Sequence, residues 1–287
     1  MYIGPKPKLK KNGDIRNVFD TKPPLKPLLK KINEVFFRQI YFPPYLTGSL
    51  AGRDFIANVD IHKGSRGVIT EDIKTFYDSI TEDQVCRIWR EFFGFAEEVA
   101  CLLTRLMTKE GRVFQGTPTS SYLANLAFWD REASLVERLA VRNIRYSRYV
   151  DDVTLSSLRE MTLEDKRWAI SQTYGMIGAA GFKPQRTKHS TLNAKCPITI
   201  MGLNANGKLK PSLTKQERAG IRARVFQLEQ RFERGDTGAD FLSELNRADG
   251  KVGRLKRLHV REGAALQRRL RIVRNAASTS ATVSSGL

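Results

Sequence analysis

Tyr149-Val150-Asp151-Asp152 is the stretch that decides the fold, because strand-like sequence lies on both sides of it. The six residues before it, Asn-Ile-Arg-Tyr-Ser-Arg, and the five after it, Val-Thr-Leu-Ser-Ser, alternate with period 2 and are rich in β-branched and aromatic residues. This pattern predicts two strands. Because Asp favours tight turns, we expect Asp151 and Asp152 at or beside the bend of a hairpin.

Two adjacent carboxylates repel each other unless a cation lies between them or water screens them. An isolated Asp-Asp pair is most often a solvated turn, but a third carboxylate, Asp72, ends a predicted strand over residues 68–73. The alternative for Asp72 is to cap a following helix. Three strand-associated carboxylates in a basic chain favour two-metal phosphoryl transfer, which needs hard oxygen ligands for Mg²⁺. Hydrolases, nucleases and polymerases share this chemistry, so the carboxylates leave the choice among them open.

The charge balance indicates a polyanionic partner. The chain of 287 residues carries 49 Lys and Arg against 30 Asp and Glu, a net charge of +19. Residues 208–287 hold 18 of the basic and 8 of the acidic residues, which is over half of that net charge. Such an excess points most often to nucleic acid; a merely soluble basic protein is the alternative.

Other compositional features exclude several classes. Three cysteines without a Cys-x-x-Cys pair, and three scattered histidines, argue against a disulfide framework and against a zinc site. No signal peptide and no long apolar run is present, so we expect a cytoplasmic protein without a membrane partner.

Apolar spacing predicts helices over residues 27–40, 82–93, 96–108, 119–141 and 164–180. A strand over residues 198–203 should be followed by a turn at Asn206-Gly207. The last part is expected to be mostly helical, with a basic outer face that suits contact with duplex phosphates and includes Arg254, Lys256 and Arg257. Residues 276–287, rich in Ser, Thr and Ala, are expected to be disordered.

A basic ribbon is predicted near the N-terminus, where Asn12-Gly13 marks a hairpin turn. Lys10 or Lys11 would lie on one strand and Arg16 on the other. Because Arg binds phosphate through a planar fork and Lys binds it as a point charge, this ribbon suits a triphosphate. A solvated basic turn is the alternative.

Three blocks of the sequence resemble the A, B and C motifs of reverse transcriptases, and they come in the right order. They are Asp-Ile-Lys-Thr-Phe-Tyr-Asp-Ser-Ile (72–80), Gln-Gly-Thr-Pro-Thr-Ser-Ser-Tyr-Leu-Ala-Asn-Leu (115–126) and Tyr-Val-Asp-Asp (149–152). The resemblance implies a right-hand polymerase of the α+β class. Fingers would occupy residues 1–66, an antiparallel palm sheet with interleaved fingers helices residues 67–207, and a helical basic thumb residues 208–275. The implied activity is RNA-directed synthesis of DNA from deoxynucleoside triphosphates.

The resemblance also implies roles for the acidic residues. Asp72 and Asp151 would hold two Mg²⁺ ions together with the Ile73 carbonyl, and Asp152 would support them. Lys188 aligns with the motif D lysine that protonates the leaving pyrophosphate.

Further roles concern the nucleotide and the primer. Lys11 (or Lys10) and Arg16 match residues that bind the incoming triphosphate, and Gln115 matches a residue near its sugar. Tyr77 matches the steric gate that blocks a ribose 2′-OH, with a core aromatic as the alternative. Gly202 and Leu203 would form the primer grip.

Within the family, the chain is most similar to the bacterial retron reverse transcriptases. Asn58-Val59-Asp60-Ile61-His62 resembles their Asn-Ala-x-x-His element, with Val59 in place of Ala. Asn58 and His62, four apart on a helix, would share a face and touch the cognate RNA. A packed or solvated histidine is the alternative for His62.

The retron resemblance implies a structured noncoding RNA as template and primer. Priming from an RNA 2′-OH would give a branched RNA–DNA product, multicopy single-stranded DNA, in antiphage defence with an effector protein encoded nearby. Group II intron enzymes, other defence-associated reverse transcriptases and a protein-primed or template-independent polymerase stay open. A non-catalytic RNA-binding scaffold is the alternative of another class.

Overall fold

The computed structural model describes residues 1–9, 13, 15–193, 197–207 and 210–284, and the chain divides into two units, Met1–Ile198 and Thr199–Leu287. Helices and antiparallel sheets occur together in the described residues, which confirms the α+β class. Of the helices in these ranges, none combines the length and the apolar character that crossing a bilayer requires.

An antiparallel sheet with the strand order β4-β5-β3-β6 organises the first unit. Its strands are β3 (Gly67–Asp72), β4 (Arg145–Tyr149), β5 (Asp152–Ser157) and β6 (Ser190–Asn193). The central strands bury the apolar residues Val68, Ile69, Val153 and Leu155. The strands predicted around the Asp-Asp stretch and before Asp72 are confirmed, whereas β6 is a strand that the sequence pattern does not indicate.

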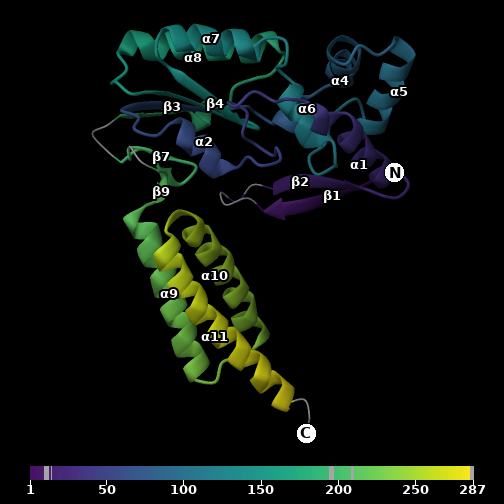
Figure 1. Ribbon diagram of the computed structural model, residues 1–287. Helices are drawn as coiled ribbons and strands as arrows, with labels where there is room; N and C mark the ends of the chain where they lie inside the picture. Colours follow the sequence, from purple (N-terminus) through teal and green to yellow (C-terminus); the bar gives the residue numbers. More distant parts are fainter. Residues whose placement is uncertain (10–12, 14, 194–196, 208–209, 285–287) are drawn as a thin grey trace. The chain divides into compact units, whose positions relative to one another are not determined.

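Helices cover both faces of this sheet (Figure 1). α7 (Glu132–Val141) and α8 (Leu163–Ala179) lie on one face, and α2 (Phe55–Ile61) lies on the other. Successive side chains of β4 point to opposite faces of the sheet, so this strand contacts the helices on both faces. Tyr146 and Arg148 bind Glu132 at the start of α7, whereas Ser147 binds Asn58 on α2.

A hairpin of β1 (Tyr2–Leu9) and β2 (Ile15–Thr21) precedes the sheet, with Leu9 opposite Ile15. This confirms the predicted ribbon, and Arg16 lies on its second strand. Lys10 and Lys11 lie outside the described residues. The backbone N–H of Phe19 donates to the carbonyl of Gln115 at 2.8 Å, so β2 runs beside the loop before α6 (Ser120–Leu126).

Two of the predicted helices are interrupted. The one expected over residues 82–93 is α4 (Glu82–Arg87) followed by a π-helical turn, Ile88–Phe92. The one expected over residues 119–141 is α6, which ends at Leu126, and then α7. The break between them places Phe128 in the core, where its ring stacks on Phe76 with 5.7 Å between centroids. Burial of this large ring outweighs the helical propensity of the segment.

The other helices of the first unit are short or lie close to their predicted places. They are α1 (Leu25–Val35), η1 (Phe37–Gln39), α3 (Phe76–Ser79), α5 (Glu97–Met107) and η3 (Arg186–Lys188).

The second unit joins a small sheet to long helices. β7 (Thr199–Ile200), β8 (Leu203–Asn204) and β9 (Ser212–Leu213) form the sheet, and α9 (Lys215–Glu233), α10 (Ala239–Leu258) and α11 (Val260–Ser284) follow. Their buried faces carry apolar residues at helical spacing, among them Ile221, Val225, Leu228, Leu245, Val252, Leu266, Leu270 and Val273.

The strand predicted over residues 198–203 is interrupted by a turn at Met201-Gly202, where φ is +50° and +75°. The chain reverses again between Asn204 and Ser212, the segment that contains the predicted turn at Asn206-Gly207. The small sheet belongs to the second unit, which begins at Thr199, and the boundary between palm and thumb at residue 208 stays a prediction. α11 continues to Ser284, where a disordered tail is predicted from residue 276. Its alanines are strong helix formers, which the Ser and Thr content masks in the composition.

Candidate active site

The predicted carboxylates meet at one end of the central strands. Asp72 is the last residue of β3 and lies opposite Asp152, the first residue of β5. The N–H of Ile73 donates to the carbonyl of Asp151 at 3.0 Å, which extends this pairing beyond the strand end. The register of two neighbouring strands thus brings together side chains that are far apart in the sequence.

A tight turn presents Asp151. Tyr149 pairs with Asp152 across the hairpin, so Val150 and Asp151 form the bend that the sequence predicts. Val150 has a φ of +62°, in the left-handed region. Asp151 therefore projects from the bend beside the end of β3.

The electrostatics of this cluster favour a cation. Burial raises the pKa of Asp151, and the charge of Asp72 adds to that shift. Burial, then the charges of Asp151 and Asp72, raise the pKa of Asp152 to about 7. Three carboxylates so close together are stable in their charged form only beside positive charge. Their oxygen atoms are the donors that Mg²⁺ prefers.

Lys188 supplies part of that positive charge. Its Nζ lies 2.5 Å from Oδ2 of Asp72. Burial opposes the charged form, but the hydrogen bond to Asp72 and the nearby carboxylates outweigh it and raise the pKa of Lys188. The N–H of Gln185 donates to the carbonyl of Asp72 at 2.7 Å, so the loop that carries Lys188 is fixed to the end of β3.

A cavity of about 210 Å³ opens beside the carboxylates. It brings together predicted nucleotide-binding and catalytic residues from five segments of the chain, and its lining includes Arg16, Asp72, Ile73, Tyr77, Gln115, Asp151 and Lys188. Tyr77 is partly buried, with its hydroxyl 3.5 Å from Ser121 Oγ, and burial raises its pKa. Asp152 is adjacent to the cavity through Asp151 but does not line it.

The side chains of Asn58 and His62, which the retron resemblance expects to touch RNA, are buried against the sheet, with 1% and 0% of their surface exposed. Asn58 donates to Ser147 Oγ at 2.9 Å, and the His62 ring lies 2.7 Å from the hydroxyls of Ser147 and Ser156. Asn58 and His62 do share a face, as their spacing predicts, and this face packs against β4 and β5.

The remaining predicted residues lie in the second unit. Gly202 occupies the β7–β8 turn, and Leu203 is fully buried in β8. Arg254 binds the Met201 carbonyl at 3.3 Å and Glu217 at 2.8 Å, so it supports this hairpin. Lys256 donates to Gln267 at 2.9 Å, and the Arg257 side chain is exposed.

Gly116 supports the site through a contact that the sequence does not indicate. Gly116 follows Gln115 and has a φ of +110°. A Cβ at this position would overlap the carbonyl oxygen of Phe19. Only glycine therefore lets β2 lie so close to the loop that carries Gln115. The Gln-Gly dipeptide is visible in the sequence, but it does not show that β2 lies against this loop.

Two cysteines come together outside this site. Cys86 Sγ and Cys101 Sγ are 4.0 Å apart, and Glu97 lies beside both. Arg90 pairs with Glu97 at 2.8 Å. This ion pair balances the charge of the Glu97 carboxylate.

Residues 6–205 match a family model described as reverse transcriptase (RNA-dependent DNA polymerase). The chain belongs to this family. The matched residues include the sheet, the carboxylate cluster and the whole lining of the 210 Å³ cavity. The resemblance of the three motifs is thereby confirmed.

Curated relatives include several retron reverse transcriptases. The chain is 35% identical to the retron Se72 reverse transcriptase of Salmonella heidelberg over 86% of its own length and 66% of the relative's. It is 27% identical to the retron Ec48 reverse transcriptase of Escherichia coli over 92% of its own length and 67% of the relative's. The chain thus spans about two thirds of the length of these relatives.

Among solved structures, the chain matches telomerases. One from Candida tropicalis, in complex with a fragment of telomeric RNA, gives a TM-score of 0.48 at 12% identity, over 95% of this chain and 61% of that one. One from Candida albicans gives a TM-score of 0.47 at 13% identity, over 86% and 46% of the two chains.

Proposed function

We propose that this chain is a retron-type RNA-directed DNA polymerase. The observation that carries the proposal is the cavity beside β3, where Asp72, Asp151 and Lys188 meet Arg16 and Gln115. Acidic, basic and amide groups in one small cavity suit a metal-bound triphosphate and its sugar. Membership of the reverse transcriptase family supports the same activity.

The donor set fits two Mg²⁺ ions. Asp72 and Asp151 would hold them with the Ile73 carbonyl, and Asp152 would add negative charge beside them. When bound, the ions supply charge stabilisation to the attacking and leaving oxygens of an in-line displacement. The raised pKa values of Asp151 and Asp152 support this assignment, because burial and then the neighbouring carboxylates disfavour their charged forms, and a bound cation would offset both.

The other residues orient the nucleotide. Arg16 would bind the triphosphate through its planar guanidinium, and Gln115 would contact the sugar. Tyr77 would exclude a ribose 2′-OH, because its ring lines the same cavity. Lys188 would hold a proton near the leaving pyrophosphate, since its raised pKa keeps the ammonium charged at neutral pH.

The substrate would be a structured noncoding RNA encoded nearby, which serves as template and primes from its own 2′-OH. Support comes from the retron relatives and from the basic residues concentrated after residue 208. The product would be a branched RNA–DNA molecule made in the cytoplasm, and an effector protein would act with it in antiphage defence. Gly202 and Leu203 would grip the primer, and Arg254, Lys256 and Arg257 would contact RNA.

Primer extension tests the polymerase itself. The purified chain should extend a DNA primer on an RNA template when deoxynucleoside triphosphates and Mg²⁺ are supplied. Asp151→Asn should abolish extension, because it removes a metal-binding charge while keeping the side-chain volume. Extension by this variant at the wild-type rate would remove Asp151 from the mechanism.

The retron part needs a separate experiment. The chain is expressed with its native flanking DNA, and the copurified nucleic acid is treated with RNase. A short discrete DNA that shifts in size, and that Asp151→Asn loses, would support branched priming. Its absence from a chain that extends supplied primers would leave a reverse transcriptase of another subfamily. Absence of both activities would favour an RNA-binding scaffold.

A further inference from the structure

Val150, the residue before Asp151, adopts a conformation that its side chain disfavours. Its φ of +62° lies in the left-handed region, where β-branched residues are rare outliers. Such a conformation persists only when the surrounding structure holds it. The direction in which Asp151 leaves the turn therefore depends on the groups that hold Val150.

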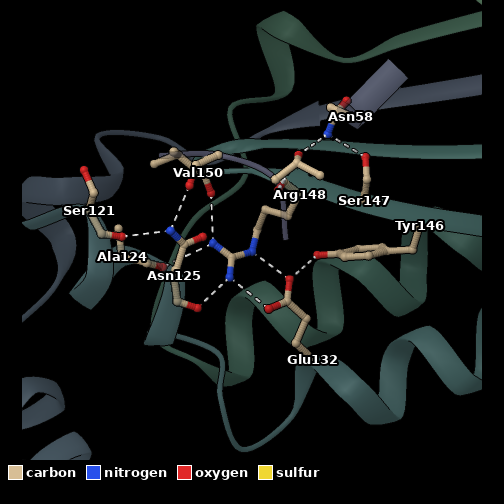
Figure 2. Close-up of polar contacts among 11 residues, drawn as sticks. Asn58, Ser121, Ala124, Asn125, Glu132, Tyr146, Ser147, Arg148 and Val150 are labelled. Carbon is tan, nitrogen blue, oxygen red and sulfur yellow. Dashed lines mark hydrogen bonds and ion pairs between the residues drawn. The ribbon is translucent and has the colours of Figure 1, made fainter. Parts of the chain in front are cut away.

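The Arg148 guanidinium is the first of them (Figure 2). It is fully buried, and each of its five N–H groups has an acceptor. Nη1 donates to the carbonyls of Val150 and Ala124 at 3.0 and 3.2 Å, and Nη2 donates to the carbonyl of Asn125 at 2.9 Å. Because Ala124 and Asn125 lie in the last turn of α6, Arg148 ties the end of the motif B helix to the motif C turn.

Glu132 fixes the guanidinium in this place. It accepts from Nε at 2.6 Å and from Nη2 at 2.8 Å, and it also accepts from the Tyr146 hydroxyl at 2.6 Å. Figure 2 shows the planar fork facing Glu132 on one side and the carbonyls on the other. A lysine has three donors on a flexible stem and cannot reproduce this arrangement.

Gly48 and Asn125 close the other side of the turn. A Cβ on Gly48 would lie 2.5 Å from the backbone N of Val150 and 2.6 Å from its Cγ2, so only glycine leaves room for the turn. The Asn125 side chain donates to the Gly48 carbonyl at 2.9 Å and to the Ser121 carbonyl at 2.9 Å. The loop that contacts Val150 is therefore fixed to α6, the helix whose carbonyls also accept hydrogen bonds from Arg148.

We propose that Gly48, Asn125 and Arg148 form a clamp that holds the left-handed turn at Val150 and thereby positions Asp151 for catalysis. The proposal rests on the polymerase function proposed above. The three are positioning residues, because none of them lines the 210 Å³ cavity. The clamp couples the motif B helix, whose preceding loop carries Gln115, to the carboxylate that motif C supplies.

Two variants test the clamp by different routes. Gly48→Ala pushes on Val150 without removing a hydrogen bond, and Arg148→Lys removes the fork while keeping the charge. Each should lower kcat for single-nucleotide incorporation by about 10- to 100-fold, the loss expected when a reacting group is misplaced by about 1 Å. KM for the nucleotide should change less than kcat, because the binding residues of the cavity are untouched. Gly175→Ala is the matched control, since a Cβ there meets open space on a helix.

Hydrogen exchange gives a readout that does not need polymerase activity. Amides in the peptide spanning the β4–β5 turn should exchange faster in Gly48→Ala and Arg148→Lys than in the wild type, while β3 amides keep their protection. If one variant does not fold, the other still decides the test. Wild-type exchange at the turn together with wild-type kcat in either folded variant would overturn the clamp.

A double-mutant comparison separates the clamp from simple support of the core. Glycine accepts the left-handed region readily, so Val150→Gly removes the need to hold the turn. In the Val150→Gly background, Arg148→Lys should therefore cost less of kcat than in the Val150 background. An equal loss in both backgrounds would show that Arg148 acts only as a core residue. If the wild type extends no primer at all, the polymerase proposal fails, while the exchange data still decide whether the clamp exists.

Discussion

His62 should make the first unit lose stability as the pH falls below about 6.5, the pKa of a free imidazole. Its buried ring is held neutral: burial first, and then the charge of Arg145, lower its pKa from 6.5 to about 3. The unfolded chain takes up a proton on this ring near pH 6.5, but the folded chain does so only near pH 3. The stabilisation is thus complete above pH 6.5 and is lost as the pH falls toward 3.

The size of the effect follows from linkage. At pH 4.5 the unfolded ring is about two pH units below its own pKa, and the folded ring is still neutral. Each unit corresponds to about 1.4 kcal/mol, so folding loses about 2.7 kcal/mol relative to pH 7.5.

Urea unfolding followed by tryptophan fluorescence measures this loss. Trp89, Trp129 and Trp168 are the three tryptophans of the chain, and all lie in the first unit. The free energy of unfolding is compared between the wild type and His62→Gln at pH 7.5 and at pH 4.5. The advantage of the wild type should shrink by about 2.7 kcal/mol at the lower pH, because the variant has no group to titrate.

Asn58→Ala is the matched control. Asn58 lies on α2, which ends just before His62, and it binds the same Ser147 hydroxyl, but it does not titrate. Its difference from the wild type should stay constant with pH. A constant difference for His62→Gln as well would refute the neutral buried ring. Each variant should lose the same fraction of activity on the cognate RNA as on a generic primer-template. A selective loss on the cognate RNA would support the predicted RNA contact.

Three further predictions concern the cavity. Tyr77→Ala should reduce discrimination against ribonucleotides about tenfold or more, measured as the ratio of kcat/KM for matched nucleotides; an unchanged ratio would remove Tyr77 from the gate role. Lys188→Gln should lower the rate of single-nucleotide incorporation about 100-fold in rapid-quench experiments, and a wild-type rate would exclude proton donation by Lys188. Gly116→Ala should raise KM for the nucleotide, because a Cβ would displace β2 and with it Arg16; a wild-type KM would mean that the ribbon does not contribute to binding.

Local patterns predicted the hairpin of β4 and β5 well. Period-2 alternation and turn propensity act over neighbouring residues, and both placed Asp151 at the bend. Asp72, Tyr77 and Gln115 meet this hairpin only through tertiary contacts between segments that are far apart in the sequence. Only the resemblance of the motifs indicated these contacts, because no single segment encodes its partner.

Two features that the sequence does not predict share a physical cause, which is tertiary burial. Helical spacing put Asn58 and His62 on one face, but spacing cannot tell whether that face meets RNA or a sheet. Two serines on β4 and β5 supply hydrogen bonds that make burial favourable. The continuous helix expected over residues 119–141 likewise breaks because Phe128 has to reach the core.

The left-handed turn at Val150 bears on how the protein assembles. The β4–β5 hairpin can form early, because its strands are neighbours in the sequence. Its bend, however, acquires the native conformation only after α6 and the Gly48 loop have docked, since these distant segments supply its contacts. A nascent or partly folded chain therefore carries the carboxylates without their final geometry. Catalytic competence should arise among the last events of folding.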